Sequence, residues 1–184
     1  MDAIEKSDSS VATTVLEWIE QKISNKKPVT ISPDGLGNWW KTFRVIQGGE
    51  VKSTNLPWVR DHGASLGSGI KERFLAAERV TQIEIDSARE NKKIIVKHLN
   101  NLITPGSAFM FPTAPCIAPL LDEDATVLDE FRANTMALTC IAGLGGLPQI
   151  TIPAVTVDGF PVGISILGSH GSDEQLLNFA NDLM

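Results

Sequence analysis

The chain has 184 residues, 42% of them hydrophobic, with 16 basic and 22 acidic side chains and a formal net charge of −6. The length suits one buried core, and the acidic balance argues against a nucleic-acid-binding or membrane-binding surface, which needs a basic face. No apolar run approaches the ~20 residues of a membrane span, the first residues do not resemble a signal peptide, and the two cysteines and three histidines are too scattered for a disulfide framework or a metal site. We therefore expect a cytoplasmic protein that needs no metal or cofactor.

The character of the chain changes near residue 104. Residues 1–104 carry 15 basic and 13 acidic side chains, whereas residues 105–184 carry Arg132 alone against nine acidic ones. Each half is small for an independent core. We therefore expect one partial domain over residues 1–184, mostly helical and charged in 1–104 and strand-rich in 105–184.

The first half reads as helices. An apolar residue recurs every three or four positions from Val11 to Ile23, which predicts a helix. Residues 39–51 predict a second, shorter helix that is interrupted at Gly48-Gly49. A third apolar stripe predicts one long amphipathic helix from Ser68 or Gly69 to Leu102, lying on a larger body.

The second half reads as strands with two helices. Residues 107–111, 149–152 and 162–168 are short apolar runs without charge, which favours buried strands. The turn dipeptide Asp158-Gly159 predicts a hairpin between residues 154–157 and 160–167. Residues 125–142 predict a helix, and a capping box at Ser172–Gln175 predicts the start of a last helix.

Three features of the second half raise the question of chemistry. Gly143–Gly146 follows a helix and precedes a strand, the reverse of a dinucleotide-binding loop, so we interpret it as a structural turn. Cys116, beside Ile117, follows the carboxyl end of a predicted strand, where α/β proteins bind ligands; His170 is the only base of the second half that could activate it. Two roles are open for Arg132. It forms a salt bridge on a helix surface, or it anchors a substrate carboxylate.

Several segments together resemble a known family. Residues 139–153, with their Gly-Leu-Pro turn, residues 158–168 and the Phe-Pro-Thr-Ala-Pro segment at 111–115 resemble the C-terminal portion of amidase signature enzymes. The resemblance runs over roughly residues 39–183 and is nearest to small-molecule amidases of the indoleacetamide hydrolase kind. It implies an α/β fold in which a mixed sheet is flanked by helices on both faces.

The resemblance also implies a reaction, the hydrolysis of a carboxamide to a carboxylate and ammonia. In that family a Ser nucleophile is activated by a second Ser and a Lys, which come from the N-terminal half and its Gly/Ser-rich loop. This sequence contains no such loop, and no Lys follows Lys97. We therefore assign no catalytic residue, and only Cys116, Ile117 and Arg132 as residues of the substrate pocket.

These observations predict the C-terminal part of an amide hydrolase that is inactive alone. The alternative is a non-enzymatic interaction domain that reuses the same scaffold. Because the three apolar strands carry no charge that would shield an exposed edge, we expect a homodimer or a complex with a complementary N-terminal amidase chain. A small-molecule amide is the expected substrate of the completed enzyme.

Overall fold

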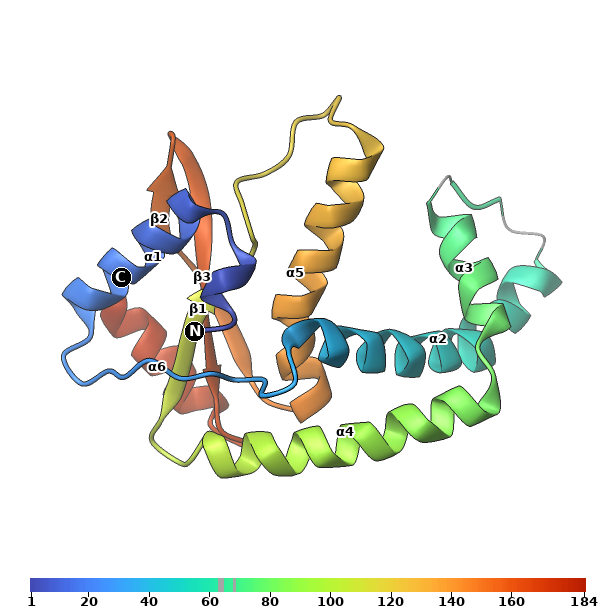
Figure 1. Cartoon of the computed structure of the whole chain (residues 1–184), viewed down its shortest axis with the longest axis horizontal. Coiled ribbons are helices and arrows are strands. Elements are labelled where there is room, and N and C mark those ends of the chain that lie inside the picture. Colours follow the sequence, from blue (N-terminus) through green and yellow to red (C-terminus); the bar gives the residue numbers. More distant parts are fainter. Residues whose placement is uncertain (63–64, 68) are drawn as a thin grey trace.

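The computed structural model describes residues 1–62, 65–67 and 69–184 and shows a small sheet with helices on both faces (Figure 1). This arrangement confirms the expected α/β class. In chain order the elements are η1 (Ile4–Lys6), α1 (Ser9–Lys22), α2 (Leu36–Asp61), α3 (Ile70–Arg79), α4 (Gln82–Leu102), β1 (Ala108–Pro112), α5 (Ala125–Gly145), β2 (Gln149–Val157), β3 (Phe160–Gly168) and α6 (Asp173–Leu183).

The sheet has the strand order β1-β3-β2, and both strand pairs are antiparallel. The β2–β3 hairpin confirms the prediction from Asp158-Gly159, because both residues have the positive φ (50° and 84°) that a tight hairpin turn requires. β3 is the central strand and pairs on both sides. Among the described residues the sheet is therefore antiparallel, and the mixed sheet that the resemblance implies is not seen.

The two faces of the sheet pack against different helices, because successive side chains of a strand point to opposite faces. Ile164 and Ile166 of β3 pack with α1 and α6, whereas Leu167 and Phe111 pack with α2, α4 and α5. All four side chains are at most 1% exposed. Figure 1 shows the same division, with α1 and α6 on one side of the sheet and α5 on the other.

The expected single helix up to Leu102 is wrong, because the structure divides it into α3 and α4 at Val80-Thr81. Thr81 has extended backbone angles, and its hydroxyl accepts a hydrogen bond from the Glu84 N–H at 3.3 Å. The Glu84 carboxylate in turn accepts one from the Thr81 N–H at 2.8 Å. This reciprocal capping starts a new helix. The proposed start at Ser68 lies outside the described residues.

The expected interruption at Gly48-Gly49 is also wrong, since α2 continues through both glycines. Their role is close packing. A Cβ on Gly48 would lie 3.0 Å from Val80 Cγ2, and a Cβ on Gly49 would lie 2.8 Å from Ile85 Cδ1. The two glycines therefore let the α3–α4 junction approach the α2 backbone, which outweighs the cost of glycine within a helix.

The two helices predicted for the second half are present. α5 extends to Gly145, three residues beyond the predicted end, and stops at Gly146 in the left-handed conformation, with φ of 64°. α6 begins after Ser172 as predicted, but the capping box is wrong. The Ser172 hydroxyl instead donates to the Ser169 carbonyl oxygen at 2.7 Å, so the preceding turn uses it.

The long helix α4 is amphipathic, as the predicted stripe required. Ile85, Ala88, Ile95 and Leu99 are buried, while the charged residues between them are exposed apart from the partly buried Lys92. Across the described parts of the chain, no helix is both long and apolar enough to cross a membrane.

Candidate substrate-facing site

The loop that leaves β1 is held first by the sheet and then, three residues after the strand, by the start of α1. The Thr113 N–H donates to the Gly163 carbonyl at 2.9 Å, which continues the pairing with β3 by one residue. The chain then departs, and the Pro115 carbonyl accepts a hydrogen bond from the Asp8 N–H at 2.8 Å. Because proline cannot donate to a ladder, Pro112 and Pro115 favour this exit. Residues 113–115 are thus held by β3 on one side and by the start of α1 on the other.

Where the loop leaves, Thr113, Gln149, Thr151 and Ser165 form a group that we call the hydroxyl cluster. The Thr113 hydroxyl lies 2.8 Å from the Ser165 hydroxyl and 3.3 Å from that of Thr151. Gln149 Nε2 donates to the Ser165 hydroxyl at 2.9 Å. Ser165 is fully buried and Thr151 is exposed, so the cluster reaches from the core to the surface on the α5 face of the sheet.

Two further features of the hydroxyl cluster are the close packing at Gly163 and the side-chain oxygen of Gln149, which is unpaired among the described residues. A Cβ on Gly163 would lie 2.6 Å from Thr151 Cγ2 and 3.2 Å from Thr113 Oγ1, so a side chain there would push the cluster apart. Gln149 Oε1 is buried, and no described residue donates a hydrogen bond to it. A buried acceptor without a partner is costly. The cluster therefore retains capacity for one further donor.

The chemistry available in this cluster is hydrogen bonding. Hydroxyls and a carboxamide orient polar groups, but a nucleophile needs a neighbouring base or a lowered pKa. Within the described ranges, no Lys or His side chain makes a hydrogen bond to a Ser, Thr or Cys side chain. The hydroxyl cluster thus forms a polar, hydrogen-bonding wall.

Cys116 and Ile117 lie in the loop after β1, both partly buried, with Ile117 packed against the cluster of α1 and α6. Burial raises the pKa of the Cys116 thiol, and the nearby charges of Asp8 and Glu123 raise it further. His170 cannot serve as its base. The β1–β3 register pairs Ala108 with Gly168, so His170, just after β3, lies near the start of β1, whereas Cys116 follows its end. The two ends of this five-residue strand are ~14 Å apart.

Arg132 lies on α5, where it pairs with Asp129 at 2.9 Å and is half exposed. This is the helix-surface salt bridge of our first interpretation. Such exposed pairs contribute little to stability. The anchoring role of Arg132, like the pocket roles of Cys116 and Ile117, stays a prediction.

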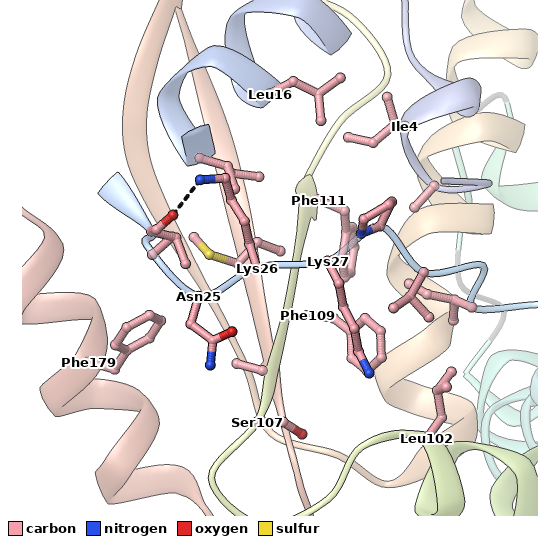
Figure 2. A pocket seen from close by; sticks show the side chains of 18 of the residues that line it. Ile4, Leu16, Asn25, Lys26, Lys27, Leu102, Ser107, Phe109, Phe111 and Phe179 are labelled. Atoms are coloured by element: carbon pink, nitrogen blue, oxygen red, sulfur yellow. Dashed lines mark hydrogen bonds between the residues drawn. The ribbon is translucent and has the colours of Figure 1, made fainter. Parts of the chain in front are cut away.

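A cavity of about 1240 Å³ lies elsewhere, along β1. Its walls come from β1, α1, α6 and the segment between α1 and α2 (Figure 2). Phe109 and Phe111 line it from the strand, and Phe179 from α6. None of the three predicted pocket residues is among those that line it, so the structure does not bring them to this cavity.

Sequence reasoning missed both the hydroxyl cluster and this cavity. A signal for the cluster existed, because Gln149 and Thr151 are polar residues two apart in an apolar strand and so share a face. Ser165 interrupts the apolar run of β3 in the same way. No sequence pattern indicated the cavity, because it depends on the path that the segment between α1 and α2 takes past β1.

With this geometry in view, the comparisons decide the family. The model of the family described as Amidase matches residues 7–177. The chain belongs to the amidase family. Amidase 1 of Arabidopsis thaliana is 30% identical over 142 residues, which cover 77% of this chain and 33% of that protein. Amidase 1 of Oryza sativa subsp. japonica is 32% identical over 144 residues, again 77% of this chain and 33% of that protein.

Solved amidase folds agree with this assignment. A crystal structure of an amidase superposes with a TM-score of 0.77 at 19% identity and covers 97% of this chain and 42% of its own. The match includes α1 and the segment after it. This amidase-family chain spans about a third of the length of the two curated plant relatives.

Proposed function

We propose that this chain is the C-terminal part of an amide hydrolase, a single partial amidase domain that converts a small carboxamide to a carboxylate and ammonia once the rest of the fold is present. The observation that carries the proposal is the family match over residues 7–177, together with the polar wall that the hydroxyl cluster builds beside the β1 exit. Its role would be to complete the sheet and to line the acyl pocket.

The same observations favour a division of labour between two chains. An acyl-transfer reaction needs a nucleophile with an adjacent base and oxyanion donors, and the described residues supply a hydrogen-bonding wall. We therefore expect the chain to be inactive alone and to work in a reducing, cytoplasmic setting as a homodimer or with a complementary N-terminal amidase chain. Its two free cysteines suit that compartment.

The test is complementation. The part of Arabidopsis Amidase 1 that this chain does not match would be co-expressed with it, and ammonia release from indole-3-acetamide would be measured. We expect turnover by the pair and none by either chain alone. The Arabidopsis part and this chain, each expressed without the other, are the controls. Stable association without ammonia release would instead support the alternative, an interaction domain that reuses the scaffold.

A further inference from the structure

The outer edge of β1 has a defined set of unpaired backbone groups. The Thr113–Gly163 hydrogen bond identifies residues 113 and 163 as a hydrogen-bonded pair. Because such pairs alternate along an antiparallel ladder, Phe111 and Phe109 also turn their N–H and C=O groups toward β3. Ala108 and Met110 turn theirs outward, and no described backbone group bonds to them. Pro112 then faces the open edge, where its missing N–H costs the sheet nothing.

This edge borders the cavity of about 1240 Å³, which Ala108 and Met110 both line, and Ala108 is also exposed to solvent. Leu16 and Ile19 of α1 and Val29 of the following segment stand opposite it, and Figure 2 shows Leu16, Lys27 and Phe179 around the strand. The volume exceeds the ~300–1,000 Å³ of pockets that hold drug-sized ligands. A mostly apolar space beside unpaired backbone groups offers what an added strand needs, which is backbone partners and room for alternate apolar side chains.

We propose that this cavity receives one extended strand from a complementary amidase-family chain, which pairs with the outward N–H and C=O groups of Ala108 and Met110. The proposal rests on the proposed function, because it names where the remaining part of the fold joins this chain. The strand would bury alternate apolar side chains against Met110 on one face and Phe109 on the other, since these two residues project to opposite sides of the sheet.

The segments that share the cavity with the edge favour this occupant over a second copy of the chain. If two copies paired edge to edge, their β1 strands would have to meet, but residues of α1 and of the segment 23–31 line the cavity on which each edge opens. A single strand from a different chain fits between these walls. Charge adds a preference. Lys26 is paired with Glu20 at 3.2 Å, whereas Lys27 forms no ion pair with a described residue, which favours an acidic side chain in the incoming strand.

Hydrogen exchange measured residue by residue by NMR tests the pairing on the full chain. The probes are the co-expressed unmatched part of Arabidopsis Amidase 1 and overlapping peptides of roughly 12 residues that tile it, about twice the length of a usual strand. We expect the amides of Ala108 and Met110 to exchange roughly tenfold or more slowly in the complex. Those of Phe109 and Phe111, already bonded to β3, serve as internal controls and should change little.

A pair of charge reversals provides the second measurement. Lys27→Glu should weaken binding of the matching peptide by roughly three- to tenfold, whereas Lys97→Glu, on the exposed surface of α4, should leave it unchanged. Binding of neither probe, or binding without protection of Ala108 and Met110, would overturn the proposal. Protection that grows with the concentration of this chain alone would assign the edge to a homodimer and would also overturn it.

The outcomes separate this inference from the proposed function. Ammonia release by the co-expressed pair with an unprotected β1 edge would reject the strand site and leave the proposed hydrolase intact. Edge protection without ammonia release would support the strand site and reject the hydrolase.

Discussion

Replacement of Gly163 by alanine tests whether the hydroxyl cluster depends on the absence of a side chain at this position. The added Cβ would lie 2.6 Å from Thr151 Cγ2, whereas carbon atoms in contact prefer about 3.5–4.0 Å. Either β2 shifts away from β3 or the Thr151 side chain rotates. Rotation gives up the 3.3 Å hydrogen bond between the Thr151 and Thr113 hydroxyls.

The expected loss follows from these contacts. Overpacking of this kind costs about 1–3 kcal/mol, and the exposed position of Thr151, which allows its side chain to rotate, places Gly163→Ala in the lower half of that range. For a chain of this size, each kcal/mol lowers the melting temperature by about 2–4 °C. Urea unfolding followed by circular dichroism measures the free energy of unfolding, and its slope against urea shows whether both proteins unfold in the same way.

A second substitution identifies the atom responsible. Thr151→Ser removes Cγ2 and keeps the hydroxyl, so Gly163→Ala combined with Thr151→Ser should recover most of the lost stability. The coupling in this double-mutant cycle should be about 1 kcal/mol. A Gly163→Ala protein as stable as the parent, or a double variant no better than Gly163→Ala, would refute the packing argument.

Three further predictions concern other parts of the chain. Gly49→Ala should lower the free energy of unfolding because its Cβ would overlap Ile85, whereas Gly37→Ala, with open space around it, should raise it by a few tenths of a kcal/mol; chemical denaturation compares the two. At pH 7.5 iodoacetamide should alkylate Cys116 more slowly than a free thiol, because its pKa is raised, and should modify Cys140, with a pKa raised to about 12, only after unfolding; mass spectrometry at increasing pH follows both. The Thr126 N–H lowers the pKa of Asp124 at the start of α5, so the stability this carboxylate adds should be present above its unfolded pKa and lost as the pH falls through its lower folded pKa. Melting temperatures of Asp124→Asn should therefore vary less over that acidic range than those of the parent.

The strands and their hairpin were predictable because local features specify them. The charge-free apolar runs match β1, β2 and β3, and Asp158-Gly159 has the backbone angles of a hairpin turn. The sequence also indicated helices on both faces through the family resemblance, but not their pairing with particular strands. That pairing depends on which side chains of β3 alternate inward, which becomes clear only once the register is known.

The two wrong predictions of helix boundaries have different physical reasons. At Val80-Thr81 the apolar stripe continues although one helix ends and the next begins. Periodicity therefore predicted a single helix, while the Thr81 and Glu84 pair already indicated a capping box. At Gly48-Gly49 local propensity suggested an interruption, but the contacts with Ile85 and its neighbours lie more than 30 residues away and override it. Local signals alone could not weigh those contacts.

Of the candidate site, the sequence located the loop but not its partners. Cys116 and Ile117 do follow the β1 exit, yet the groups that organise this exit are the hydroxyls of Thr113 and Ser165, 52 positions apart in the chain. Arg132 was found because it is the single cation of the second half. Its neighbour on the helix, Asp129, sits close enough in sequence for the pair to be foreseen.

The register of the sheet also sets an order of assembly. The β2–β3 hairpin closes a two-residue turn, so it can form within microseconds, whereas Ala108 must find Gly168 across 60 residues that include all of α5. Loop-closure entropy delays such distant pairing. β1 therefore joins a hairpin that already exists, and its register with β3 pairs five positions where that of β2 pairs seven, so it is the strand with the fewest bonds to lose. We therefore expect β1 to be the last strand to join the sheet during folding and the first to separate from it when the sheet opens.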